Sequence, residues 1–331
     1  MSDTGGILGL AGSRIGILEN SFDPVTRMHI DLCRKYMQSL DLSRVILVLS
    51  DSDNHCEAVR HKDRWRMLAA ACGPYKNLFP EDLPDASPRS LRKKYPDDEL
   101  VFLSASQEDD KRCCPSVDEY IHALGLYGVP PRITDGRARI KKLFKALNPH
   151  RFAHSLAVAS TSRELAVLYG EDPEKAEEAG LFHDCAKCLP LREMRQIAEL
   201  HHLTDDPHVL ESGSLLHSVV GAHLAGTEYG ISDEEVLRAI LYHNTGRVGM
   251  SRLAMCVCLA DFIEPNRESF PELENVRKLS SSSLEEALLL SLECTQAHVE
   301  SSGNYLHPWT TQTISWLSSL CRNNHSSFPS R

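Results

Sequence analysis

The spacing of hydrophobic and polar residues along the sequence differs between two parts of the chain. Up to about residue 130, short apolar runs rich in β-branched residues alternate with stretches in which apolar residues recur every three or four positions. Strands that alternate with helices are typical of a doubly wound parallel sheet. A proline-rich polar stretch at 79–88 interrupts the pattern. We expect an α/β fold with strands at 13–18, 44–49 and 99–103 and helices at 25–40, 61–72 and 91–95.

After the sequence GVPP at 128–131, the pattern becomes helical throughout. Several segments carry helix start or stop signals, such as a proline at the first helical position or a glycine after the last one. We therefore predict an all-α bundle, with a linker near residue 130 and two domains, 1–130 and 131–331. The helices are expected at 137–147, 150–169, 173–187, 214–229, 233–242, 251–263, 283–301 and 308–321.

Composition limits the class of protein. The 331 residues are 42% hydrophobic and 25% charged, which is typical of a folded chain of about two domains. No apolar run approaches the roughly 20 residues that span a bilayer, and the first residues do not have the pattern of a secretory signal. The 11 cysteines then indicate the reducing cytoplasm, where thiols stay free.

Charge and histidine content narrow the chemistry. The net charge of −10 disfavours a nucleic-acid partner, which needs a basic face to neutralise phosphates. A small anionic substrate stays compatible with it, because a few local cations or a bound metal reverse the local field. Twelve of the 16 histidines lie at or after His150, so metal or proton-transfer chemistry is expected in the second half.

The dipeptide His183-Asp184 stands in the sequence AGLFHDCAK. It offers an imidazole nitrogen and a carboxylate oxygen to one cation. Adjacent residues of a helix point about 100° apart, so both side chains reach one ion only near a helix end or in a cleft. Such a dipeptide alone is weak support for a metal site.

Other polar residues interrupt apolar helical stripes in the same half: His154, His217, His243 and Asp261. A single histidine of this kind is more often a core residue whose ring nitrogens are hydrogen-bonded. A buried carboxylate such as that of Asp261 needs a partner. A metal site inside a helical bundle would explain together why polar residues occur in the apolar stripes of several successive helices.

Five segments resemble the HD phosphohydrolase superfamily, and within it the bacterial HD-domain symmetrical diadenosine tetraphosphatases. They are RFAHSLAVA, AGLFHDCAK, SLLHSVVGAHLA, GISDEEVLRAILYHNTGR and MSRLAMCVCLADFIEPNR, within residues 137–320. The chain departs from the family at Asn244, where threonine is more common. The resemblance implies hydrolysis of diadenosine tetraphosphate, a small dinucleoside polyphosphate, into two ADP.

The resemblance also implies roles for individual residues. A divalent metal, iron in the first place, would bind His154, His183, Asp184 and Asp261. Manganese and zinc stay open, since imidazole and carboxylate suit all three metals. Asp184 and Lys187 would be catalytic, and the polyphosphate would face Arg151, Lys187, His217, His243 and Arg267. Without the resemblance, Lys187 and Arg267 are as well explained as solvated surface cations.

Two alternatives stay open for His217 and His243. With one metal ion, they are expected to contact phosphate as protonated imidazoles. With a second ion, both are expected to be ligands. The pair Cys185 and Cys188 is interpreted as small core or neighbouring residues rather than a redox motif, because that motif needs a thioredoxin-like βαβ context.

The segment IGILENSFDPVTRMHIDL near the N-terminus resembles the first motif of nicotinate mononucleotide adenylyltransferases. Phe22, Asp23 and His29 match that motif, and Thr26 stands where its first histidine belongs. Glu19-Asn20 and Met28 replace glycines that let the backbone approach phosphate. The family's phosphate-binding arginine has no counterpart before the sequence PSVDEYIHALGLYG. We expect a shortened domain with a degenerate nucleotide site. Its role would be to bind a nucleotide, to sense one or to serve only as a scaffold, and adenylyltransferase activity is the alternative.

Overall fold

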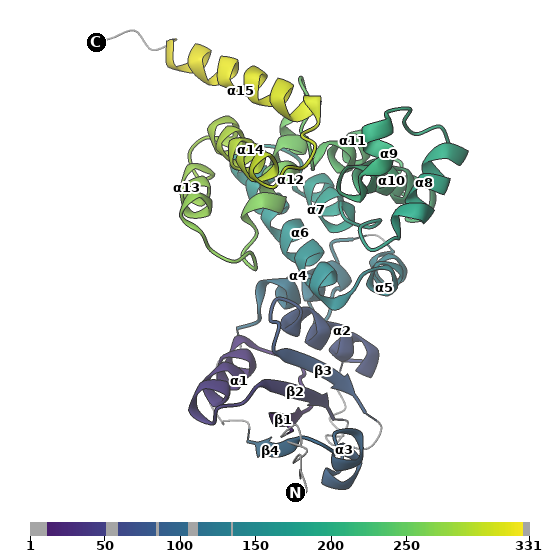
Figure 1. Ribbon diagram of the computed structural model, residues 1–331, viewed down its shortest axis with the longest axis vertical. Helices are drawn as coiled ribbons and strands as arrows, with labels where there is room; N and C mark the ends of the chain where they lie inside the picture. The colour runs from purple at the N-terminus through teal and green to yellow at the C-terminus, as the bar shows by residue number, and fades with distance from the viewer. Residues whose placement is uncertain (1–11, 51–58, 84–85, 105–111, 134, 327–331) are drawn as a thin grey trace, which may run out of the picture. The chain divides into compact units, whose positions relative to one another are not determined.

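The computed structural model describes residues 12–50, 59–83, 86–104, 112–133 and 135–326 (Figure 1). The chain forms two compact units, Met1–Val117 and Asp118–Arg331, which divide within helix α4 (Pro115–Leu124). The domain boundary between residues 130 and 131 stays a prediction of the sequence.

The N-terminal unit contains a four-stranded sheet in the order β3-β2-β1-β4, with all neighbouring strands parallel. Helices follow the first three strands in the chain, so strands and helices alternate (Figure 1). The predicted α/β fold class is confirmed. The elements are β1 (Arg14–Asn20), α1 (Arg27–Ser39), β2 (Arg44–Leu49), α2 (His61–Cys72), β3 (Leu78–Asp82), α3 (Pro88–Lys94) and β4 (Glu99–Leu103).

The register of the sheet explains its continuous apolar strands. Ile17 of β1 pairs with Ile46 of β2, and alternate residues of a strand share one face. On that face, Ile15, Ile17, Ile46 and Val48 pack against Leu91 of α3. The intervening residues of the central strands are buried as well. Central strands of a parallel sheet are covered on both faces, so they do not alternate between apolar and polar residues.

Strand β3 lies partly in the stretch that the sequence indicated as a proline-rich interruption, and that prediction was wrong for residues 79–82. Pro80 lies opposite Leu47 of β2 in this strand. Proline has no N–H to donate to a neighbouring strand, and it is tolerated here because β3 is at the edge of the sheet.

Helices are the only regular secondary structure among the described residues of the C-terminal unit, as predicted. Helix α6 packs against α7 and α12, and α11 packs against α7, α10 and α12. The helices after α4 are α5 (Gly136–Ala146), α6 (Pro149–Tyr169), α7 (Pro173–Phe182), α8 (Leu191–Leu200), α9 (Pro207–Glu211), α10 (Gly213–Thr227), α11 (Glu234–Tyr242), α12 (Arg252–Ile263), α13 (Pro271–Leu279), α14 (Leu284–Ser301) and α15 (Pro308–Ser326).

Two details differ from the predicted helices. The helix expected at 173–187 ends at Phe182, and turns follow it through 188. Helices α4, α8, α9 and α13 were not predicted. The described ranges contain no helix with the length and apolar character that crossing a membrane requires.

Candidate metal centre and adjoining cleft

Five helices place polar side chains around one point inside the C-terminal unit. These side chains are His154 of α6, His183 and Asp184 at the end of α7, His217 of α10, His243 at the end of α11, and Asp261 of α12. All are buried except Asp261, which is partly exposed. The sequence predicted all six as site residues, and the structure brings them together.

The end of α7 allows two successive residues to point at the same place. His183 is the C-cap residue, and Asp184 lies in the turn that follows. Within a continuing helix their side chains would diverge by about 100°. Of the two arrangements that the sequence left open, a helix end or a cleft, the structure shows a helix end, which lies before the predicted one at 187.

Close packing of α7 on α6 brings this pair near His154. Gly180 of α7 lies against Ala159 of α6, and a Cβ atom at Gly180 would be 2.9 Å from the Ala159 Cα atom. Only glycine fits this contact without moving one of the two backbones. The packing of α6 and α7 therefore depends on Gly180.

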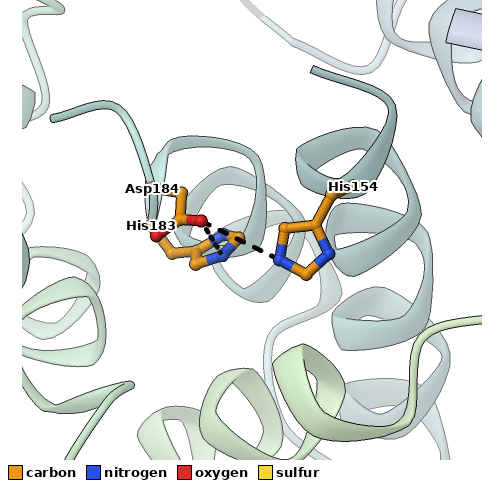
Figure 2. A group of neighbouring side chains, drawn as sticks. All are labelled: His154, His183 and Asp184. Atoms are coloured by element: carbon orange, nitrogen blue, oxygen red, sulfur yellow. Dashed lines mark ion pairs between the residues drawn. The ribbon is translucent and has the colours of Figure 1, made fainter. Parts of the chain in front are cut away.

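Figure 2 shows His154 facing His183 and Asp184. The Asp184 Oδ2 atom is 3.6 Å from His183 Nε2 and 3.9 Å from His154 Nε2. Asp261 Oδ1 is 3.0 Å from His154 Nε2 and 3.8 Å from His183 Nε2. Three sets of side chains each bring one ligand atom within 4.8 Å of the others: His154, His183 and Asp184; His183, His243 and Asp261; and Asp184, His217 and His243.

Hydrogen bonds fix the orientation of the imidazole rings. His183 Nδ1 donates to the Gly180 carbonyl at 2.7 Å, and His243 Nδ1 donates to the Ile240 carbonyl at 2.7 Å. Each bond uses the Nδ1 proton and leaves Nε2 directed at the cluster. Metal-binding histidines in proteins are oriented in this way by their other ring nitrogen.

Glu264 orients the third ring and was missed by the sequence analysis. Its Oε1 atom lies 3.2 Å from His154 Nδ1, and its Oε2 atom accepts a hydrogen bond from Asn266 N at 2.6 Å. The side chain is almost fully buried. A glutamate that ends an apolar helix next to a metal-site aspartate, in the sequence ADFIEPN, was the available signal.

Several inward atoms of the cluster are left without a hydrogen bond. They are His154 Nε2, His183 Nε2 and Asp184 Oδ1, all buried. Buried polar atoms are normally satisfied, so three such atoms facing one point need a common partner. Imidazole nitrogens and carboxylate oxygens in this arrangement fit a divalent transition-metal ion.

The carboxylates of the cluster stay ionised. Burial would raise the pKa of Asp184, but the adjacent His183, His217 and Lys187 side chains hold it well below its usual range. Burial likewise opposes the ionised form of Asp261, but the charge of His154, whose Nε2 atom lies 3.0 Å from Asp261 Oδ1, lowers the pKa of Asp261. In turn, Asp261 and Glu264 overcome the effect of burial and raise the pKa of His154 to about 9.

His217 and His243 behave differently from the protonated imidazoles that the sequence predicted. Burial lowers the pKa of each ring to about 4, although Asp184 favours the protonated form of both. Both rings are therefore neutral at neutral pH. Their Nε2 atoms lie 3.1 Å apart, and His217 Nε2 lies 3.2 Å from Asp184 Oδ1.

Three cationic side chains surround the cluster, as predicted from the sequence. Arg151 Nη1 donates to Asp184 Oδ2 at 3.0 Å, and Lys187 Nζ lies 3.1 Å from His217 Nε2 and 3.8 Å from Asp184 Oδ1. Arg267 Nη2 lies 3.8 Å from Asp261 Oδ1 and donates to the Asp261 carbonyl. Two cations thus contact Asp184 and the third contacts Asp261.

A cleft of about 460 Å³ opens on the side of Asp261 and His243. It extends along α14 and past the segment between α12 and α13. Its lining residues are His243, Asn244, Cys258, Asp261, Phe262, Arg267, Phe270, Ser291, Leu292, Cys294, Thr295 and His298. Apart from His243, Asp261 and Arg267, these residues were not predicted as site residues.

Cys185 and Cys188 do not form a disulfide, and every cysteine that the structure describes is free. Cys185 is buried and its Sγ atom donates to the Gly221 carbonyl, while Cys188 is exposed. Burial raises the pKa of Cys185 to about 12, so its thiol is not ionised at neutral pH. This agrees with the interpretation of Cys185 as a packing residue.

The predicted N-terminal nucleotide site has a different character. His29, at the start of α1, is buried, and its Nδ1 atom accepts a hydrogen bond from Thr26 N at 3.1 Å. Phe22 is fully buried, contacts the His29 ring edge to face, and has a φ of +44°. Asn20 Oδ1 accepts from Phe22 N, so a side chain supports the turn. Part of the interval searched for the missing arginine, residues 105–111, lies outside the described residues.

Comparisons with known protein families match both units. The family described as HD domain matches residues 151–266, and the family described as cytidylyltransferase-like matches residues 18–133. The first range contains the whole metal-centre cluster, and the second contains β2, β3, β4 and the end of β1. The predicted arrangement of two fused domain types is thus confirmed.

Two named relatives cover different shares of the chain. The symmetrical bis(5'-nucleosyl)-tetraphosphatase of Bacillus subtilis (strain 168) is 41% identical over 172 residues, covering 52% of this chain and 91% of the relative. A Mycoplasma genitalium protein, named probable nicotinate-nucleotide adenylyltransferase/Ap4A hydrolase, is 32% identical over 205 residues, or 60% of this chain and 54% of that protein.

A crystal structure from Clostridium acetobutylicum, described as a predicted HD superfamily hydrolase involved in NAD metabolism, superposes with a TM-score of 0.54. It is 39% identical and covers 55% of this chain and 96% of its own. The extent of the Bacillus match, the HD-domain match and the clustered His and Asp residues lead to one assignment. The chain belongs to the HD-domain family of symmetrical bis(5'-nucleosyl)-tetraphosphatases.

Proposed function

We propose that the C-terminal unit hydrolyses diadenosine tetraphosphate symmetrically, adding one water across the central phosphoanhydride bond to give two ADP. The observation that carries this proposal is the buried His/Asp cluster with cations at two of its edges. A polyphosphate has negative charge on both sides of its central bond. Arg151 and Lys187 beside Asp184, and Arg267 beside Asp261, match that distribution.

We propose His154, His183, Asp184 and Asp261 as the residues that hold the metal ion. When bound, a divalent ion polarises a phosphoryl oxygen and lowers the pKa of water. Iron is the proposed metal, with manganese and zinc as the alternatives compatible with these ligands. Because the pKa of His154 is raised to about 9, this ring has to release a proton when it becomes a ligand.

We assign the cations to charge stabilisation. Arg151 and Lys187 lie within 4 Å of one Asp184 carboxylate, so their charges are concentrated where phosphate would approach the cluster. Lys187 Nζ is a mobile donor that can follow a bridging oxygen as negative charge develops on it. This gives Asp184 and Lys187 the catalytic roles expected from the resemblance.

The roles of His217 and His243 are proposed separately. His243 uses its Nδ1 proton at the Ile240 carbonyl and is neutral at pH 7, so its Nε2 atom has no proton to donate to phosphate. This favours the alternative in which His243 is a further metal ligand. His217 lies between Lys187 and Asp184, and we retain the proposal that it contacts phosphate.

A metal-supplemented screen of dinucleoside polyphosphates tests the proposed function. The full chain is prepared free of metal, reloaded separately with Fe²⁺, Mn²⁺ or Zn²⁺, and its products are separated by chromatography. We expect hydrolysis of diadenosine tetraphosphate only in reloaded samples. The absence of hydrolysis with every metal would contradict the proposal.

Adenylyltransferase activity of the N-terminal unit is the second candidate, because residues 18–133 match the cytidylyltransferase-like family. Against catalysis, the His29 Nδ1 atom is occupied by Thr26, and burial lowers the pKa of the ring. We propose a non-catalytic role for this unit, such as nucleotide sensing. Consumption of ATP with nicotinate mononucleotide by the full chain would overturn that proposal. A cytoplasmic location stays a prediction from the cysteines.

A further inference from the structure

The cleft beside the metal centre is lined by two chemically different sets of side chains. One set is His243 and Asp261, which belong to the His/Asp cluster. The other set consists of two phenylalanines, Phe262 and Phe270, and several residues of α14. A ligand with phosphates at the cluster would therefore extend its next chemical group along this second set.

We propose that this cleft binds one adenosine of the substrate, with the base between Phe262, Phe270 and helix α14. The proposal rests on the proposed function, since it takes the phosphates to lie at the metal centre. The volume of about 460 Å³ falls within the range of about 300–1,000 Å³ that is typical of small-molecule sites.

The aromatic wall is held at a fixed distance from the metal centre. Phe262 follows Asp261 directly in α12, and its ring meets the Phe270 ring edge to face at 6.1 Å. Arg277 of α13 donates to the carbonyls of Ile263 and Glu264, which anchors the segment between the two rings. Aromatic rings so placed provide a surface on which a nucleobase stacks.

Arg267 lies between the aromatic wall and the metal centre. Its guanidinium carbon lies 5.4 Å from the centroid of the Phe262 ring, while its Nη2 atom contacts Asp261. A cation between the aromatic wall and the metal centre matches a nucleotide, in which phosphate adjoins a nucleoside.

The hydroxyl groups of α14 favour an amino-bearing base. Ser291 Oγ donates to the Leu288 carbonyl at 2.8 Å, and Thr295 Oγ1 donates to the Ser291 carbonyl at 2.9 Å. Because each hydroxyl has one proton, both oxygens have only acceptor capacity left. Adenine carries an amino group at the position where hypoxanthine carries a carbonyl, so adenine is the better complement.

Binding of three ligands to the metal-loaded full chain tests this proposal. ADP has the complete nucleotide, IDP lacks the amino group of the base, and inorganic pyrophosphate lacks the nucleoside. We expect Phe262→Leu and Phe270→Leu to raise the Kd for ADP about tenfold, which is in the range of a lost base–aromatic stack. The Kd for pyrophosphate, which has no base, should change less than about twofold. Tyr305→Leu is the matched control, because Tyr305 has similar exposure (43% against 36% for Phe270) but does not line the cleft.

Thr295→Val tests the hydroxyl group while keeping the side-chain shape. The parent should bind ADP about fivefold or more tightly than IDP, as one hydrogen bond would produce, and the variant should lose most of that preference. Unchanged ADP affinity in both phenylalanine variants, an equal loss for pyrophosphate, or equal affinity of the parent for ADP and IDP would overturn the proposal. Hydrolysis by the parent is measured separately, so failure of the proposed function would be recognised independently.

Discussion

The two units each contain a histidine at a family-motif position near the start of a helix, and the two rings have different partners. His29 accepts a hydrogen bond from the backbone of Thr26, three residues away. His154 is oriented by Glu264, 110 residues away, and its Nε2 atom faces the metal centre without a hydrogen bond. The His29 Nδ1 atom is hydrogen-bonded within its own turn, whereas the His154 Nδ1 atom is hydrogen-bonded to a residue far away in the sequence.

This difference shows what separates a structural histidine from a chemical one. A ring bonded to its own helix start stabilises that helix and has less capacity left for a ligand. A ring whose Nδ1 atom is held by a distant carboxylate and whose Nε2 atom is left over has a reactive nitrogen at a defined position. Residue type alone would have given His29 and His154 equal weight.

Asp184→Asn should have the largest effect of any single substitution in the cluster. The change removes the negative charge that His217, Lys187 and Arg151 contact, and removes one proposed metal ligand. We expect turnover to fall on the order of a thousandfold, with loss of bound metal measured by elemental analysis. Asp205→Asn, at an exposed position of the same unit, is the control. Full metal content and activity in Asp184→Asn would place the site elsewhere.

His243→Ala should lower metal content as well. Its neutral ring presents an unprotonated Nε2 atom to the cluster, which suits a ligand better than a phosphate donor. We expect a loss of about one equivalent of metal per chain, because an ion that needs His243 as a ligand would no longer bind. Near-normal metal content with weaker substrate binding would instead support the phosphate role that the sequence predicted.

Glu264→Ala should weaken metal binding by about 10–100-fold, because the His154 ring would lose the carboxylate that orients it. Glu264→Gln keeps a hydrogen-bond acceptor of the same size, so it should recover part of the affinity. Metal titration of the parent and both variants measures this effect. Equal affinity in all three proteins would show that His154 is positioned without Glu264.

His29→Ala should have the smallest effect, a loss of about 1–2 kcal/mol in the free energy of unfolding. Burial lowers the pKa of His29, so the unfolded chain binds more protons near pH 6 and the ring contributes most above pH 6.5. The stability difference between parent and variant should therefore shrink as pH falls below 6.5. Thermal unfolding at pH 5 and pH 8 measures it, and a difference that grows at pH 5 would contradict this account.

Periodicity predicted the two fold classes, and polar residues on apolar helical stripes, together with the family resemblance, predicted the six residues of the cluster. The helix end that lets His183 and Asp184 point at one place was not predicted, because the expected helix continued to residue 187. Strand β3 could not be predicted, because Pro80 is acceptable only at the edge of a sheet, and strand order is a property of the whole unit.

The cleft and Glu264 could not be predicted for a related reason. Phe262, Phe270 and Thr295 come from two helices and a connecting segment, and no spacing in the sequence links them. Glu264 contacts His154 across 110 residues, so its role depends on the packing of α6 and α12. Local sequence patterns show which residues could bind a metal or a ligand. Tertiary packing determines which of these residues lie together in one site.

The central claim is that the His/Asp cluster between the cations cleaves the middle of a polyphosphate, and product stoichiometry tests it most directly. The metal-loaded full chain is incubated with diadenosine tetraphosphate, and substrate and nucleotide products are counted by chromatography over a time course. The account predicts two ADP for each substrate consumed, with no other nucleotide. Formation of AMP together with ATP would contradict it.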